Sequence, residues 1–279
     1  MIFLYTRFSL VNKNMTKAWK TSTLTVQEQI DNVVANDERL RGRLKIFLDR
    51  TVKNIEKAHI EGAQVRHFVF ASTLISSWAQ DLLSNAEKNY SWLKIIWVTY
   101  EEDFNIVEST RALISEEFQG RNQGGVYSLL RLDDDDILAP HFFEYISRYA
   151  VDAFVGKAIS LPAGVNALYD SKLDTYTHFV ESYDEKIAIG LGFINHCSET
   201  GEHRIKSAVP NVSHKKIDRQ VPLILDGTIS YCWIRSLHET NDTYVQRLGD
   251  GVEIPIINKV KLSEHPLSKD LVDKYFVFL

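Results

Sequence analysis

Cysteine is scarce in this chain, which has only Cys197 and Cys232 among its 279 residues. Two cysteines are too few for a disulfide framework, and their separation shows no metal-ligand spacing. The chain must therefore fold on its hydrophobic core, and we expect both cysteines to be small core residues. This usage fits a reducing compartment best, so we expect a cytoplasmic protein.

Long hydrophobic runs are also missing. The opening MIFLYTRF is apolar for only about five residues and has no basic leader, so it is too short for a signal peptide or a spanning helix. We expect it to form a first buried strand. No later stretch approaches a membrane span, although lysine, arginine and aromatic residues leave a peripheral membrane association open.

The chain has no excess of positive charge, because 32 lysine and arginine residues face 37 acidic ones and the net charge is −5. Binding nucleic acid requires a concentrated basic surface, so the composition excludes a protein with that main role. Hydrophobic residues make up 44% of the sequence. That is enough for one large α/β domain or for two halves that share a core.

Short apolar runs alternate with longer helical patterns as far as residue 150. The expected strands are residues 2–6, 67–71, 93–99 and 126–132. The expected helices are residues 26–58, 74–86 and 104–118. This alternation predicts a mostly parallel, Rossmann-like sheet with helices on both faces.

The second half has shorter apolar runs and more turn residues, which predicts a mixed β region. Within residues 222–237, the pair Asp226-Gly227 predicts a hairpin, because Asp-Gly between apolar runs favours tight turns. No Pro/Gly/Ser linker separates the halves. We therefore expect residues 1–150 and 151–279 to form one compact unit with a cleft between them.

Four consecutive aspartates, residues 133–136, follow the fourth expected strand and precede a helix that Pro140 is expected to begin. Ligands of such sheets bind at the carboxyl ends of the strands. In an extended segment Asp133 and Asp135 would share one face, and the other two aspartates would share the opposite face.

Neighbouring carboxylates repel each other unless a cation lies between them. Magnesium or manganese suits this role and completes its shell with water and phosphate oxygens. An acidic run taken alone is more often a solvated loop, but the flanking strand and helix favour a site.

Several short motifs occur in the order found in the bacterial rhamnosyltransferase family. They are TRF at residues 6–8, RLKIF at 43–47, RLDDDD at 131–136, LPAG at 161–164 and LHETN at 237–241. The chain resembles this family over most of its length, apart from residues 165–220. The resemblance implies a GT-A-like α/β fold and a glycosyltransferase that moves a monosaccharide from a nucleotide-sugar donor to a glycan acceptor. It also implies a role in bacterial surface polysaccharide synthesis.

The same resemblance implies a DxD-type metal motif carried by Asp133 and Asp135, with Asp136 at a further acidic position. Asp134 departs from relatives that often have asparagine there. His238 matches a late histidine that reaches the metal or the diphosphate, and Asn241 would contact the donor or orient its loop. The implied cofactor is a divalent metal, manganese or magnesium.

On the donor side, Arg7 and Arg131 are candidates for the phosphates, because a guanidinium can bind phosphate oxygens in a bidentate manner. Thr6 ends the first expected strand and is placed to meet the base or ribose. An inverting reaction would also need a base for the acceptor hydroxyl. The candidates lie in the second half and are Glu181, Asp184, His214 and Asp226.

Two other functions remain open from the sequence. An aspartate cluster at a strand end also suits a metal-dependent phosphoesterase or nucleotidyltransferase, although such enzymes usually have further ligand motifs. A non-catalytic relative could instead keep the acidic segment to bind carbohydrate or nucleotide. The spacing of an EF-hand loop is absent, which argues against a dedicated calcium site.

Overall fold

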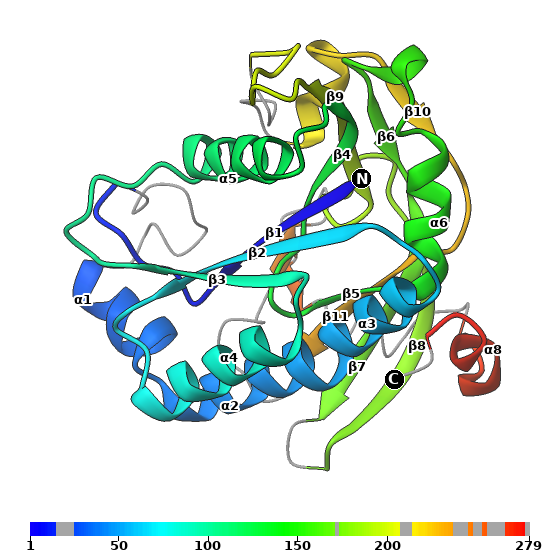
Figure 1. The fold of residues 1–279 in the computed structure, drawn as a ribbon. Coiled ribbons are helices and arrows are strands. Elements are labelled where there is room, and N and C mark those ends of the chain that lie inside the picture. Colours follow the sequence, from blue (N-terminus) through cyan, green and yellow to red (C-terminus); the bar gives the residue numbers. More distant parts are fainter. Residues whose placement is uncertain are drawn as a thin grey trace.

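A seven-stranded sheet with the strand order β10-β6-β9-β4-β1-β2-β3 forms the centre of the protein (Figure 1). The computed structural model describes residues 1–14, 25–170, 173–206, 214–236, 245–247, 253–255 and 266–276. Four neighbouring strands are parallel. They are β1 (Ile2–Phe8), β2 (Val65–Ser72), β3 (Leu93–Val98) and β4 (Gly125–Arg131). All four were expected close to these positions, and the predicted α/β fold with a parallel arrangement of these strands is confirmed.

The second half of the chain extends this sheet with strands of both directions. β9 (Leu191–Cys197) runs antiparallel to β4 and to β6 (Ala158–Ser160). β10 (Leu223–Leu225) lies parallel to β6 at the edge. The mixed β character predicted for this half is therefore confirmed.

Helices cover both faces of the sheet (Figure 1). On one face, Leu4 of β1 shares a core cluster with Leu44 and Leu83, from α2 (Asp37–Ile46) and α4 (Ser77–Asn89). On the other, Phe3 packs with Phe118 of α5 (Ile106–Gly120). Adjacent residues of β1 thus serve opposite faces, as the period of a strand requires.

The helix expected over residues 26–58 is a series of segments. They are α1 (Val26–Gln29), the π-helical η2 (Ile30–Val34), α2, the π-helical η3 (Phe47–Thr51) and α3 (Val52–Ile60). The series is interrupted before α2, where the Asn36 side chain accepts a hydrogen bond from the Arg39 backbone N–H. Asparagine is a favourable N-cap, so a new helix begins there.

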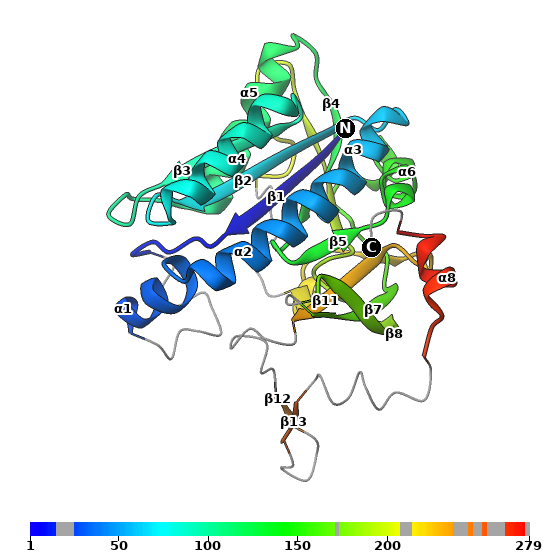
Figure 2. The same ribbon diagram turned by 90° about the horizontal axis from the view of Figure 1, so that it is seen from below.

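A second, four-stranded sheet has the order β5-β11-β7-β8 and lies beside α2 and α3 in Figure 2. Its strands are β5 (Asp136–Leu138), β7 (Ala163–Asp170), β8 (Thr175–Tyr183) and β11 (Tyr231–Ser236). The remaining elements are α6 (Pro140–Arg148), the short 3₁₀ helices η4 (Asp152–Phe154) and η5 (His214–Arg219), β12 (Val245–Arg247), β13 (Glu253–Pro255) and α8 (Lys269–Asp273). Among the described residues, no helix is both long and apolar enough to span a bilayer.

The hairpin predicted around Asp226-Gly227 is wrong. β10 pairs with β6 in the large sheet, whereas β11 pairs with β7 and β5 in the second sheet. The Asp226 carboxylate accepts hydrogen bonds from the Thr228 hydroxyl at 2.9 Å and from the Tyr149 hydroxyl at 2.9 Å. The turn is therefore held against α6 and its following residues, and it passes the chain from one sheet to the other.

Candidate active site

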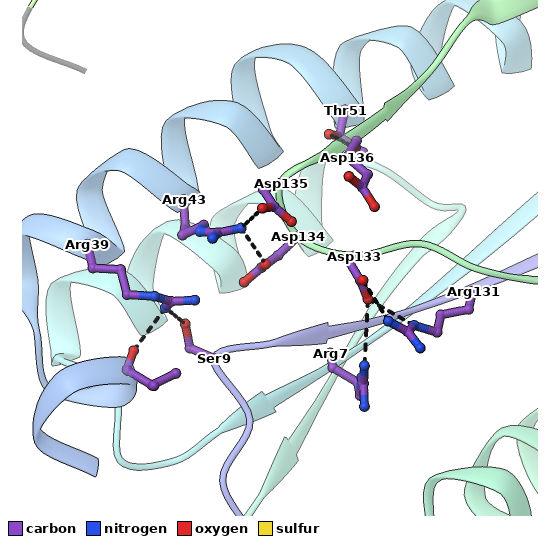
Figure 3. A network of polar contacts seen from close by, with 11 residues as sticks. Arg7, Ser9, Arg39, Arg43, Thr51, Arg131, Asp133, Asp134, Asp135 and Asp136 are labelled. Atoms are coloured by element: carbon purple, nitrogen blue, oxygen red, sulfur yellow. Dashed lines mark hydrogen bonds and ion pairs between the residues drawn. The ribbon is translucent and has the colours of Figure 1, made fainter. Parts of the chain in front are cut away.

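The acidic segment lies where the chain leaves the large sheet and enters the second one. Residues 133–135 form a turn between β4 and β5, closed by a hydrogen bond of 3.2 Å from the Asp136 N–H to the Asp133 carbonyl. The alternation expected for an extended segment is therefore wrong. Asp134 and Asp135 both face Arg43, and Asp133 faces Arg131 and Arg7 (Figure 3).

Asp133 is held by two arginines from adjacent parallel strands. Arg131 Nε lies 2.9 Å from Oδ1 and Arg131 Nη2 lies 2.6 Å from Oδ2, which is a bidentate pair. Arg7 Nη2 approaches Oδ1 at 3.7 Å. Burial alone would raise the pKa of Asp133, but the guanidinium groups of Arg131 and Arg7 outweigh it, and the pKa is lowered. This carboxylate therefore stays ionised.

Arg43 lies on α2, and its side chain reaches the same turn. Its Nη1 lies 3.3 Å from Asp134 Oδ1 and also pairs with Asp135 Oδ2. The side chains of Arg43, Asp134 and Asp135 are 7%, 9% and 14% exposed, so the cluster is largely desolvated. Burial raises the pKa of Asp134, the neighbouring carboxylates add to the effect, and Arg43 opposes it.

Asp136 is separate from the other three aspartates (Figure 3). It is buried at the start of β5, and its carbonyl accepts a hydrogen bond of 2.8 Å from the Thr51 hydroxyl of η3. The contact ties the helical run to the second sheet. Its side chain does not line the cavity described next.

A cavity of about 170 Å³ opens beside the turn. Its charged lining residues are Arg7, Arg39, Arg43, Asp133, Asp134 and Asp135, and its other lining residues are Leu10, Val11, Gln29 and Val33. Arg39 Nη1 donates hydrogen bonds to Ser9 Oγ at 2.8 Å and to the Val33 carbonyl at 2.9 Å. Ser9 follows β1 with a φ of 42°, and left-handed backbone in a non-glycine residue often occurs at functional sites.

Arg39, Leu10, Val11, Gln29 and Val33 are the cavity residues that sequence reasoning did not single out. For Arg39, the spacing of arginines in the sequence was an available signal. Arg39 and Arg43 are four residues apart in an expected helix and so share one of its faces. The segment at 10–11 offered no such signal, because its apolar residues resemble the continuation of a buried strand.

The other predicted donor residues are placed differently. Thr6 is fully buried, and its hydroxyl shares a hydrogen bond of 2.8 Å with Nε2 of His67, so its side chain lies in the core and not on the cavity. The first strand was expected to end at Thr6, but β1 continues to Phe8, and the Thr6 side chain faces inward. His238 and Asn241 lie outside the described residues.

None of the four base candidates is among the described residues that line the cavity. Glu181 belongs to β8, Asp184 pairs with Lys215, and Asp226 forms the turn before β11. His214 Nδ1 contacts the Lys186 carbonyl. Burial lowers the pKa of His214, the hydrogen bond to the Lys186 carbonyl opposes this shift, and the positive charge of Lys215 adds to it.

At one part of the turn, the carboxylate oxygens of Asp134 and Asp135 are suitable ligands for a divalent cation. Asp134 Oδ2 is buried and has no hydrogen-bond partner among the described residues, and both Asp134 and Asp135 line the cavity. Magnesium and manganese can bind through one or two carboxylates and complete their shell with substrate oxygens. Asp133 is committed to Arg131 through both oxygens. No group of three acidic, histidine or cysteine side chains gathers for a metal in the described part of the chain, so such a cation would depend on the ligands of a bound substrate.

A family model with the description "Putative rhamnosyl transferase" matches residues 1–250. Among solved structures, similarity extends to the mannosyltransferase PcManGT from Pyrobaculum calidifontis in complex with GDP-Man and Mn²⁺, at 11% identity and a TM-score of 0.30. That match covers 57% of this chain and 34% of the mannosyltransferase, so this chain spans about a third of that protein's length. A "Putative Glucose-1-Phosphate Thymidylyltransferase" from Bacillus anthracis in complex with a sucrose matches at 8% identity and a TM-score of 0.35, over 83% of this chain and 89% of that one. No curated protein matches the sequence.

Proposed function

Because the chain belongs to the rhamnosyl transferase family, whose model spans residues 1–250, we propose that it moves a monosaccharide from a nucleotide-sugar donor to a glycan acceptor with the help of a divalent cation. The family match confirms the predicted membership of this family. It also confirms the prediction of a glycosyltransferase. The donor, the metal and the acceptor are the parts of the proposal that experiment must test.

The observation that carries the proposal is the cavity at the carboxyl end of β1, beside the acidic turn. Three arginines line it together with three aspartates. A diphosphate is a good match for guanidinium groups, which donate paired hydrogen bonds to phosphate oxygens. The apolar side chains of Leu10, Val11 and Val33 line the same cavity and suit a base or a ribose.

Asp134 and Asp135 are the residues that we propose to hold the cation. A bound magnesium or manganese ion would supply Lewis-acid stabilisation of the negative charge on the leaving diphosphate. Arg7 and Arg131 flank the same turn through Asp133. Their charges favour the departing phosphate group, and Asp133 keeps both guanidinium groups oriented.

The acceptor side remains a prediction from the family resemblance. It would be a surface polysaccharide or a similar glycan, extended in the bacterial cytoplasm. If the reaction inverts the sugar, its base would be one of Glu181, Asp184, His214 and Asp226. If it retains the configuration, no such base is needed.

The decisive experiment combines binding and turnover in an Asp135→Ala variant. Thermal unfolding of the wild-type protein should shift upward with one nucleoside diphosphate in manganese, and much less in chelator, because a ligand that binds the folded state raises its stability. In Asp135→Ala this shift should disappear. Turnover with the matching nucleotide sugar should fall by roughly a hundredfold or more, since Lewis-acid stabilisation contributes several kcal/mol.

Asp81→Ala is the matched control, because Asp81 is exposed on α4 away from the turn. It should keep both the manganese-dependent shift and the turnover. Full activity in Asp135→Ala would contradict the metal assignment. A wild-type protein that binds no nucleoside diphosphate under any of these conditions would contradict the proposed donor site.

A further inference from the structure

Arg43 occupies the place between two carboxylates that a bound cation would need. Its guanidinium contacts Asp134 Oδ1 at 3.3 Å and also Asp135 Oδ2 (Figure 3). All three side chains line the cavity. Asp134 and Asp135, which we call the acid pair, therefore already have a cationic partner, the guanidinium of Arg43 on α2 of the same chain.

The acid pair also has binding capacity that Arg43 does not use. Asp134 Oδ2 is buried without a hydrogen-bond partner among the described residues, on a side chain that is 9% exposed. An unsatisfied buried carboxylate oxygen is costly unless a ligand completes it. The guanidinium satisfies one oxygen of Asp134 and leaves the second for another donor or a metal ion.

A guanidinium and a divalent cation cannot share the space between these carboxylates, because like charges at short range in a desolvated site repel strongly. Arg43 must therefore leave Asp134 and Asp135 before a divalent cation can bind there. Arg43 lines the same cavity as Arg7 and Arg39, so its guanidinium would stay within reach of that cavity after release. It would then be available to an anionic group such as a phosphate.

We propose that Arg43 is a built-in competitor of the divalent metal, which lowers the metal affinity of the free protein and makes its own guanidinium available to the substrate when the metal binds. This inference rests on the proposed function, because it takes Asp134 and Asp135 as the metal site. It predicts that metal alone binds weakly here. The metal and an anionic substrate then bind cooperatively, since each favours the arrangement in which Arg43 has left the acid pair.

The test is direct measurement of Mn²⁺ binding to Arg43→Gln in the absence of any nucleotide. Calorimetry measures this binding, and so does the electron paramagnetic resonance signal of free Mn²⁺. Loss of the competing positive charge should tighten Mn²⁺ binding by about tenfold or more. Arg41→Gln is the matched control. Arg41 loses the same charge from the same helix but is exposed and stacks on Trp78, with its guanidinium carbon 4.4 Å from the ring centre. Its Mn²⁺ affinity should equal that of the wild type.

A second variant covers the case in which Arg43→Gln does not fold with its acid pair uncompensated. Arg43→Lys keeps the charge but cannot bridge two carboxylates as a planar guanidinium does. Its Mn²⁺ affinity should lie between those of the wild type and Arg43→Gln, and Mn²⁺ should raise its midpoint of thermal unfolding more than that of the wild type.

Equal Mn²⁺ affinity in the wild type and both Arg43 variants would overturn the competition and leave the metal site intact. Binding of Mn²⁺ to none of them would overturn the competition together with the metal part of the proposed function. In that second case, a nucleoside diphosphate that still stabilises the protein in chelator would leave glycosyl transfer standing. The failures of the two proposals are thus distinguishable.

Discussion

The four aspartates at 133–136 are neighbours in sequence, yet they have different partners. Asp133 forms a bidentate pair with Arg131, Asp134 and Asp135 share Arg43, and Asp136 is buried at the start of β5. The pKa values of Asp133 and Asp134 shift in opposite directions, since burial would raise that of Asp133 but its arginines lower it, whereas burial raises that of Asp134. At the scale of single residues, the site is therefore a set of arginine–aspartate pairs and not a uniform acidic patch.

His67 offers a residue-scale prediction about acid stability. It is fully buried on β2, its Nε2 lies 2.8 Å from the Thr6 hydroxyl, and burial lowers its pKa to about 3. In the unfolded chain a histidine has a pKa of about 6.5. Between these values the unfolded state binds a proton that the folded state does not. The free energy of unfolding should therefore fall by about 1.4 kcal/mol for each pH unit from 6.5 down to about 3 on account of this residue, with no such loss above 6.5.

Replacement of His67 by glutamine should remove this contribution and make the acid limb of stability shallower by that slope. Urea unfolding at pH 7, 6, 5 and 4 measures it, because carboxylates contribute equally to both proteins. His59→Gln is the control, since His59 is exposed on α3, and its acid limb should match that of the wild type. Parallel acid limbs for the wild type and His67→Gln would show that His67 takes up its proton at an ordinary pH.

At the scale of elements, the pairing of β7 with β11 forms the middle of the second sheet, which the chain enters directly after the acidic turn. Gly164 of β7 lies opposite Tyr231 of β11, and a Cβ at position 164 would lie 2.4 Å from the Tyr231 ring. The ring has little freedom to move, because its hydroxyl bonds to the Pro162 carbonyl at 3.1 Å and to Ser182 Oγ at 3.2 Å. Glycine is needed here for close approach.

Gly164→Ala should therefore destabilise the protein by about 1–3 kcal/mol, the usual cost of overpacking a core. Chemical denaturation gives this value directly. Gly227→Ala provides the control, because no atom lies within 4 Å of its added Cβ and its φ is not left-handed. It should change stability by less than about 0.5 kcal/mol. A Gly164→Ala protein as stable as the wild type would mean that Tyr231 and β11 can shift away from β7.

At the scale of the whole molecule, one core cluster includes residues from both halves of the chain. Leu4 and Leu130 of the parallel strands belong to the same cluster as Leu161 and Tyr231. The acidic turn passes between the two sheets, and the Thr51 hydroxyl bonds to the first residue of β5. Neither half can unfold without exposing apolar surface of the other.

We therefore expect a single cooperative transition in urea, as two-state proteins show. Fluorescence should report mainly the first half, which contains Trp19, Trp78, Trp92 and Trp97, whereas far-ultraviolet circular dichroism reports the whole chain. The two curves should coincide. A Trp233→Phe protein, which lacks the one tryptophan beyond residue 150, should give the same fluorescence midpoint. Separate midpoints for the two signals would show that the halves unfold independently.

The elements that could be predicted from the sequence are those with local signals. Alternating apolar runs located the parallel strands, and Pro140 marked the first residue of α6 because its fixed φ and missing N–H suit that position. The same pattern located the acidic segment at the end of β4, next to Arg131. These features depend on residues a few positions apart, so periodicity and turn chemistry are enough to find them.

The assembly of the site depends on packing between elements that are distant in the sequence. Arg43 is 91 positions from Asp134 along the chain, and only the packing of α2 against the sheet brings the two together. The turn geometry at 133–135 replaced the expected alternation, because Arg43 and Arg131 draw the aspartates in different directions. The chain at Asp226-Gly227 joins two sheets, because β10 pairs with β6 and β11 pairs with β7. Contacts between distant residues depend on the packing of whole elements, and no local pattern in the sequence encodes that packing.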